Sequence, residues 1–113
     1  MNINVNRVKI IVTVPSENTD DVRKAMCEAG AGVIGNYTYC STVTKSIGTF
    51  IPNDEASPYI GEINRFETVK EDKLEVICDI VKVKHVIEEL RRVHPYEEPA
   101  IDIIPLLDEE SFK

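Results

Sequence analysis

The stretch LEVICDIVKVKHVIEELRRVHPYEEPAIDIIPLL, residues 74–107, predicts a strand, a helix and a second strand in succession. Apolar side chains alternate with others at its start, and the extended segment to which they belong covers residues 66–80. The apolar positions of residues 82–93 instead recur every three or four residues, which predicts an amphipathic helix. His94 precedes a proline and therefore ends that helix. Residues 100–107 predict the last strand, and the proline near its end indicates a sheet edge, because proline has no amide for the ladder.

The beginning of the chain predicts another strand followed by another helix. In residues 7–14, RVKIIVTV, alternate side chains are β-branched and apolar, and a proline ends the strand. Ser16 or Thr19 is expected to cap a helix that continues to Ala29, because apolar residues then recur at helical spacing. Gly30 follows as the residue that ends the helix, since glycine readily takes a positive φ.

The middle of the chain is expected to contain the remaining strand. Residues 36–44 alternate at period two, and residues 45–64 are predicted to be irregular because glycine, proline and asparagine interrupt them. An extension of the strand through residues 49–51, beyond a bend at Gly48, is left open. The order strand-helix-strand-strand-helix-strand, with right-handed crossovers, predicts an α+β ferredoxin-like sandwich. Such a fold has a four-stranded antiparallel sheet with both helices on one face.

The length and charge of the chain limit its class. Its 113 residues suit one domain, expected over residues 1–107 and followed by a frayed acidic tail at 108–113. Thirteen Lys and Arg residues against twenty Asp and Glu residues give a formal net charge of −7. This balance argues against nucleic acid or an anionic membrane as a partner, because binding to phosphates depends mainly on Lys and Arg.

The cysteines and the N-terminal segment indicate a cytoplasmic protein. Cys27, Cys40 and Cys78 are too far apart for a zinc-finger pattern, and reduced, partly buried thiols are the simplest interpretation. The N-terminal apolar run is too short to span a bilayer and has no signal-peptide cleavage pattern.

The second face of the predicted sheet is not uniformly polar. Ile11, Ile77, Ile104 and Leu106 lie opposite the predicted core positions. An exposed apolar sheet face is unfavourable for a monomer, which predicts self-association. The charged run at residues 67–73 is interpreted as a solvated face or a protected edge, with an intersubunit charge ladder as the alternative.

Residues 30–35, GAGVIG, match the spacing of a dinucleotide-binding loop. That loop requires a strand before the glycines and a helix after them, so that the helix N-terminus holds the pyrophosphate. Here the predicted helix precedes the glycines and a strand follows them. We therefore interpret the motif as a helix end followed by a tight turn.

The hexamer HPYEEP, residues 94–99, places an imidazole, a phenol and two carboxylates in one short loop that two prolines stiffen. One hypothesis is a general base or metal ligand in an interfacial cleft. The other is a rigid loop whose Tyr96 packs and whose charges form ion pairs. A metal site of Cys40, Cys78 and His94 is a further hypothesis, although isolated buried thiols are the more ordinary interpretation.

Several strings stand in a recognisable order along the chain. They are AGAGVIGNY at 29–37, CS at 40–41, GTF at 48–50, Pro58, IGE at 60–62, LE at 74–75 and HPYEEPA at 94–100. Together they closely resemble the middle, inserted domain of the Nif-three-like family, whose members are also described as dinuclear-metal-centre or GTP cyclohydrolase type 2 homologues. The resemblance covers about residues 7–107.

This resemblance implies a fold similar to that of CutA and PII signalling proteins, which are ferredoxin-like trimers that bind small ligands or ions at subunit clefts. In full-length members of the family, the two-metal site is built from His, Asp and Glu residues of the flanking domains. The present chain has two histidines, neither of them in an HH or DxH motif. The resemblance therefore does not carry the family's hydrolase label to this chain.

The leading hypothesis is a small homo-oligomeric binding or regulatory module of the CutA/PII type, expected to be a trimer. The candidate ligand-binding residues are His94, Tyr96, Glu97 and Glu98, with Asn36, Tyr37 and Cys40 as a second group. No residue is assigned as catalytic or as a metal ligand, and the cofactor is open, with a divalent metal as one candidate. The alternatives are a metal-dependent hydrolase that uses the HPYEEP loop and a protein–protein adaptor.

Overall fold

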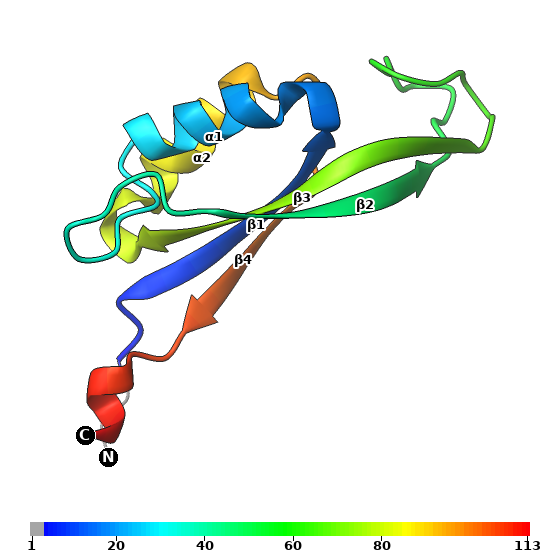
Figure 1. Ribbon diagram of the computed structural model, residues 1–113. Helices are drawn as coiled ribbons and strands as arrows, with labels where there is room; N and C mark the ends of the chain where they lie inside the picture. Colours follow the sequence, from blue (N-terminus) through cyan, green and yellow to red (C-terminus); the bar gives the residue numbers. More distant parts are fainter. Residues whose placement is uncertain (1–3) are drawn as a thin grey trace.

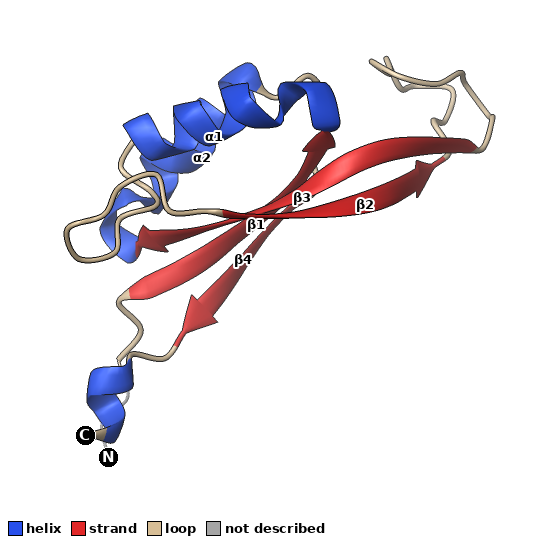
Figure 2. Cartoon of the chain, in the orientation of Figure 1, coloured by secondary structure: helices blue, strands red, loops and turns tan. Residues whose placement is uncertain are grey.

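Two helices lie side by side on one face of a twisted antiparallel sheet, and a long hairpin of the sheet extends beyond them (Figure 1, Figure 2). The computed structural model describes residues 4–113. Its main elements are β1 (Arg7–Pro15), α1 (Thr19–Glu28), β2 (Thr42–Phe50), β3 (Glu67–Asp79), α2 (Val83–Val93) and β4 (Ile101–Leu106). Single 3-10 turns occur at Ser16–Asn18, Ile80–Lys82 and Glu109–Phe112. The strand order β2-β3-β1-β4 confirms the predicted ferredoxin-like topology.

The core lies between the helices and the centre of the sheet. β1 is a central strand, and its Ile10 stands opposite Val76 of β3 and Ile103 of β4. The even-numbered apolar side chains of β1 face the helices and are 0–5% exposed. Met26 of α1 and Leu90 of α2 are fully buried against them. Complete burial of each such side chain contributes about 1.5–3 kcal/mol, which makes this layer the main source of stability.

The GAGVIG motif ends α1, as its interpretation from the sequence predicted. Gly30 has φ +117°, and its amide donates to the Cys27 carbonyl at 3.1 Å while the Ala31 amide donates to the Met26 carbonyl at 3.1 Å. This pair of bonds is a Schellman motif, which requires a left-handed residue at the helix end. Gly32 then donates to the Ile77 carbonyl at 2.7 Å, so the turn is fixed to β3.

The predicted strand at 36–44 is wrong in its boundaries, because β2 begins only at Thr42 and runs to Phe50. Ile34 and Tyr37 exchange two backbone hydrogen bonds across a tight turn, and Tyr39 has φ 58°. A left-handed residue interrupts extended backbone, so alternation of residue types there does not produce a strand. Gly48, predicted as a bend, lies within the regular ladder of β2.

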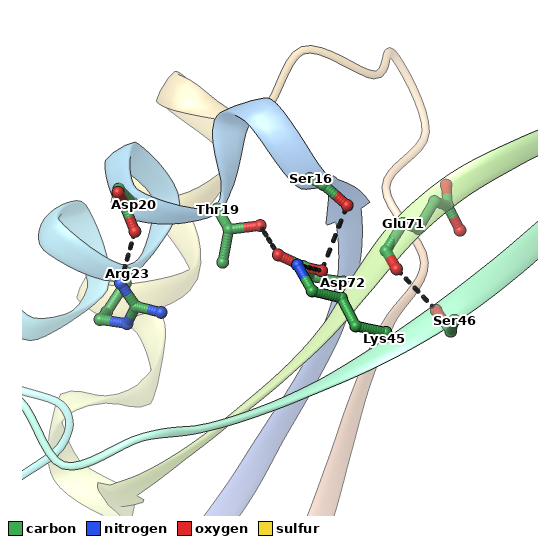
Figure 3. A network of polar contacts seen from close by, with 8 residues as sticks. All are labelled: Ser16, Thr19, Asp20, Arg23, Lys45, Ser46, Glu71 and Asp72. Carbon is green, nitrogen blue, oxygen red and sulfur yellow. Dashed lines mark hydrogen bonds and ion pairs between the residues drawn. The ribbon is translucent and has the colours of Figure 1, made fainter.

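The start of α1 is held by Asp72 of β3 and not by a side-chain cap. The Thr19 and Ser16 hydroxyls donate to the two Asp72 carboxylate oxygens at 2.6 and 3.2 Å (Figure 3). Lys45 of β2 forms an ion pair with the same carboxylate at 2.9 Å. No side chain caps the helix at Asn18, so the predicted capping by Ser16 or Thr19 is wrong. Both hydroxyls instead connect the helix to the sheet.

The sheet face away from the helices carries alternating apolar and charged side chains. Lys9 stands between Ile77 and Ile104 in one row of the sheet. In the next row Ile11 stands between an acidic residue of β3 and one of β4, Glu75 and Asp102. The face is therefore mixed, and the four apolar residues that the sequence places on it do lie there.

The first residue of β1 and the last residue of β4 lie side by side. Arg7 at the start of β1 stands opposite Leu106 at the end of β4. The sequence predicts a frayed tail over residues 108–113. Residues Glu109–Phe112 of this segment form a 3-10 turn, and the Asp108 carboxylate accepts a hydrogen bond from the Glu110 amide at 3.1 Å.

The helices are short. α1 has 10 residues and α2 has 11. A bilayer-spanning helix needs about 20 apolar residues, and among residues 4–113 no helix has the length and apolarity to cross a membrane.

Replacing Asp72 by Asn is expected to destabilise the fold, because the variant keeps the shape of the side chain and loses its charge. We expect the free energy of unfolding at neutral pH to fall by about 1–3 kcal/mol. The hydrogen bond from Thr19, supported by Lys45 and Ser16, holds the pKa of Asp72 below its ordinary value of 3.8. A depressed pKa stabilises the folded state above the unfolded-state pKa, and this contribution is lost as the pH falls through the folded-state pKa. The difference between the two proteins should therefore shrink below about pH 4.

Urea denaturation at a fixed protein concentration, from neutral pH down to about pH 2.5, measures this difference. Asp20→Asn is the matched control, because Asp20 is 93% exposed and forms only a surface pair with Arg23. Its effect should stay below about 1 kcal/mol. A loss of stability in Asp72→Asn that is the same at every pH would contradict the electrostatic role.

Candidate functional site

A cavity of about 610 Å³ lies where the HPYEEP loop, residues 94–99, meets the segment that joins β2 to β3. Side chains from residues 48–60 form one side, and the HPYEEP loop forms the other. Thr13 of β1 and Glu71 of β3 lie between them. We call this space the HPYEEP cavity.

The cavity exists because β1 and β4 are shorter than the hairpin. Pro15 is the last β1 residue paired with β3, where it stands opposite Glu71, and β4 begins only at Ile101. β2 and β3 continue to the pair of Phe50 and Glu67. The loop before β4 thus lies beside a part of the hairpin that has no neighbouring strand.

Tyr96 is at the centre of the site. Its hydroxyl donates to the Glu71 carboxylate at 2.8 Å. Its ring centroid lies 5.0 Å from that of His94, 6.3 Å from Tyr59 and 6.4 Å from Phe50. Burial, followed by the hydrogen bond to Glu71, raises the pKa of Tyr96 above its usual value of 10.0. The phenol therefore stays protonated and acts as a hydrogen-bond donor.

Glu71 is a buried carboxylate that faces the cavity. The residue is 6% exposed, and its carboxylate lies over Gly48, where a Cβ would force it to move. Tyr96 provides its side-chain hydrogen bond, and Glu71 forms no ion pair with any residue in the part of the chain described. A buried carboxylate is unfavourable unless charged or polar groups compensate it. A ligand that donates a hydrogen bond to the Glu71 carboxylate or carries a positive charge would therefore stabilise it.

His94 fixes the loop and does not line the cavity. Its Nδ1 accepts a hydrogen bond from the Tyr96 amide at 3.1 Å, so Nε2 carries the proton and donates to the Thr13 carbonyl at 2.9 Å. Burial lowers the pKa of His94, against opposing effects of the Thr13 carbonyl and Glu71. The imidazole is therefore neutral at pH 7, with both ring nitrogens already bonded.

Glu97 and Glu98 differ in what they contact. The Glu97 carboxylate accepts a hydrogen bond from the Ser57 amide at 2.9 Å, which ties the β2–β3 segment to the HPYEEP loop. Glu98 is exposed and lines the cavity. Both residues are exposed and line the cavity, and the Glu97 carboxylate in addition holds the β2–β3 segment in place.

The second group of predicted site residues lies elsewhere. Asn36, Tyr37 and Cys40 belong to the loop before β2, whereas the cavity lies at the other end of that strand (Figure 1). Cys40 lies outside the hairpin in which the sequence placed it, and Cys78 is buried on β3. Within residues 4–113, no three or more His, Cys, Asp or Glu side chains are close enough to hold one metal ion.

Glu71, Phe50 and Tyr59 belong to the site and were missed by the sequence analysis. Glu71 lies in the charged run 67–73, which was interpreted as a solvated face. Its burial depends on Tyr96 and on the lack of a side chain at Gly48. Since both contacts are made across the fold, no local pattern signals them.

Comparison with known proteins finds similarity over most of the chain. A GTP cyclohydrolase 1 type 2 homologue from Halalkalibacterium halodurans is 45% identical over 101 residues, which cover 89% of this chain and 27% of that protein. A Bacillus cereus protein related to NIF3 superposes with a TM-score of 0.79 at 35% identity, over 94% of this chain and 27% of its own. The periplasmic divalent cation tolerance protein CutA from Archaeoglobus fulgidus superposes with a TM-score of 0.65 at 22% identity, over 88% of this chain and 83% of its own. No protein-family model matches the chain.

The chain spans only 26–27% of the length of the curated relatives that it matches. The likeness to CutA concerns the fold alone, because the two sequences are 22% identical. The resemblance predicted from the AGAGVIGNY and HPYEEPA strings is confirmed: this chain resembles a segment of the Nif-three-like GTP cyclohydrolase 1 type 2 homologues, and it has the ferredoxin-like fold that CutA shares.

Proposed function

We propose that this chain is a ligand-binding or regulatory module, and that its ligand binds in the HPYEEP cavity. The observation that carries the proposal is the buried Glu71 carboxylate facing a cavity of about 610 Å³. Small-molecule sites are typically concave spaces of roughly 300–1,000 Å³ with a few polar groups on a largely apolar wall. His94 supports binding over catalysis, because both of its nitrogens already hold the loop.

We also propose that copies of the chain assemble as a trimer. β2 is an edge strand, so the outer backbone groups of Thr42–Phe50 face no further strand of the described chain. Ile47 on this strand is 69% exposed, and the protruding hairpin gives the molecule extents of 52 × 28 × 24 Å. An exposed edge favours pairing with another chain. The isoleucines of the second sheet face add apolar area that a neighbouring copy would cover.

Our proposal places the chain in the cytoplasm. Cys27, Cys40 and Cys78 are all free thiols. Burial raises the pKa of Cys27 and of Cys78, so both stay protonated. Unpaired, partly buried thiols are ordinary in a reducing compartment.

A second candidate is a hydrolase, because the relatives are named GTP cyclohydrolase homologues, and we propose that it would depend on a metal. That name belongs to proteins of which this chain spans about a quarter. In this chain, Glu97 and Glu98 would supply the carboxylates, and His94 would have to give up its bond to Thr13 or to the Tyr96 amide before it could bind a metal.

Filling the cavity is expected to abolish ligand binding while the fold persists. Ala56 lines the cavity and is half-buried, so Ala56→Trp places an indole in the space. The natural chain is titrated with GTP, amino acids, small amines, guanidines, Zn²⁺ and Mn²⁺, and amide NMR signals are followed. We expect at least one compound to shift signals of residues 48–60 and 94–99, and Ala56→Trp to weaken that binding at least about tenfold.

Val81→Trp is the matched control, because Val81 is 86% exposed and lies outside the cavity. Binding that shifts only residues elsewhere in the chain would contradict the proposal. GTP turnover with stoichiometric metal, lost in Glu97→Gln, would support the hydrolase in its place. A stable protein partner without any small-molecule shift would support an adaptor.

Ile104→Asp is expected to weaken the assembly. Ile104 is 43% exposed on the second sheet face, and burying a carboxylate in a contact between copies is unfavourable. Light scattering on a sizing column should give three times the mass of one chain for the natural protein and a lower mass for the variant. Val81→Asp, on the turn before α2, should leave the mass unchanged. A natural chain that elutes as a monomer at about 100 µM would refute the trimer.

A further inference from the structure

The wall of the HPYEEP cavity is acidic. Glu55, Glu71, Glu97 and Glu98 line it, and the described residues contribute no Lys or Arg to it. The whole chain carries a formal net charge of −7. An anionic ligand would be repelled from this space, whereas a cation would be attracted to it.

Two neighbouring buried carboxylates of β3 are compensated very differently. Asp72 is 3% exposed and has an ion pair with Lys45 and hydrogen bonds from Ser16 and Thr19. Glu71 is 6% exposed, and among the described residues its carboxylate accepts a side-chain hydrogen bond from the Tyr96 hydroxyl alone, while the Ser46 hydroxyl donates to its backbone carbonyl. Figure 3 shows the two side chains on β3, with Asp72 inside its network and Glu71 pointing away from it. A buried charge needs compensation, and the Glu71 carboxylate lacks the ion pair and the second hydroxyl donor that Asp72 has. Glu71 lines the cavity, so a ligand there can supply the missing compensation.

Three aromatic rings line the cavity together with this carboxylate. The Tyr96 ring, whose hydroxyl bonds Glu71, is inclined at 58° to Phe50 and at 54° to Tyr59, so these rings do not cover one another face to face. All three residues line the cavity. A positive charge within about 6 Å of a ring centroid is attracted to the face of the ring.

These groups suit an organic cation better than a bare divalent ion. Ca²⁺ and Mg²⁺ take about six or more oxygen ligands, whereas much of this wall is aromatic and apolar. One oxygen of Glu71 is already bonded to Tyr96. Guanidinium is weakly hydrated and stacks on aromatic faces while its N–H groups bond a carboxylate. The volume of about 610 Å³ accommodates the rest of such a molecule.

We infer that the HPYEEP cavity binds an ammonium or guanidinium group, which pairs with Glu71 and lies against the rings of Phe50, Tyr59 and Tyr96. The inference rests on the proposed binding function and adds the chemical class of the ligand. The cationic group belongs either to a free small molecule or to a Lys or Arg side chain of a peptide, since both present the same chemistry to Glu71.

Titration of the full chain with three probes tests this inference. The probes are methylguanidinium, agmatine and a Gly-Arg-Gly peptide with blocked ends, added at constant ionic strength and followed by amide NMR. We expect saturable shifts at Gly48, Tyr59 and Tyr96, and binding at least about tenfold weaker in Glu71→Gln. Tighter binding of agmatine than of the peptide supports a free ligand, and the reverse order supports a partner's side chain.

Glu75→Gln is the matched control, because Glu75 lies on the same strand and the same sheet face and does not line the cavity. Its affinity for each probe should equal that of the natural chain. Tyr59→Leu removes a ring and no charge at a residue that is 54% exposed, and it should weaken binding several-fold even if Glu71→Gln fails to fold.

Absence of saturable shifts at the cavity with every cationic probe would overturn the inference, as would equal affinities for the natural chain and Glu71→Gln. If the cations fail while GTP shifts cavity signals and Ala56→Trp blocks it, the ligand class is wrong and the proposed binding function stands. If no compound shifts these signals, both are wrong.

Discussion

The site depends on where β1 stops. Pro15 has no amide to continue the ladder, and the 3-10 turn at Ser16–Asn18 then leads the chain into α1. Residues 67–70 of β3 continue to pair with β2 beyond that point. Along residues 67–70, the edge of β3 that faced β1 has no neighbouring strand and would be exposed to solvent. The HPYEEP loop takes that place, and the Thr13 carbonyl, which β4 does not reach, becomes the acceptor for His94. The length of β1 therefore decides the position of Tyr96 and of the cavity that Tyr96 lines.

Successive residues of a strand point to opposite faces of the sheet, and β3 uses this alternation at Glu71 and Asp72. Asp72 faces the helices and holds the start of α1 through Thr19, so its charge is part of the internal structure. Glu71 faces the other way, bonds Tyr96 and lines the cavity. Two adjacent acidic residues thus have separate surroundings, and a change in one need not disturb those of the other.

Most of the architecture could be predicted from the sequence because its elements repeat at clear periods. The valines of residues 8–14 and the apolar stripe of residues 83–90 leave few alternatives to a strand and a helix. The boundary of β2 could not be predicted, because the left-handed Tyr39 belongs to a turn whose residue types also suit a strand. For the site, the HPYEEP loop itself was found, since its composition is unusual. The burial of Glu71 was not, because it results from a contact with Tyr96 across 25 residues of chain.

Arg7 and Leu106 are partners in the ladder of β1 and β4, so the two ends of this fold lie close together. Paired strands lie about 4.7–4.9 Å apart, so the two points at which this unit would join a longer chain are close together. Bringing such closely spaced junctions together adds little loop-closure entropy to the surrounding protein. A βαββαβ unit whose two ends lie so close together can therefore form part of a much longer polypeptide, such as the relatives of which this chain spans about a quarter.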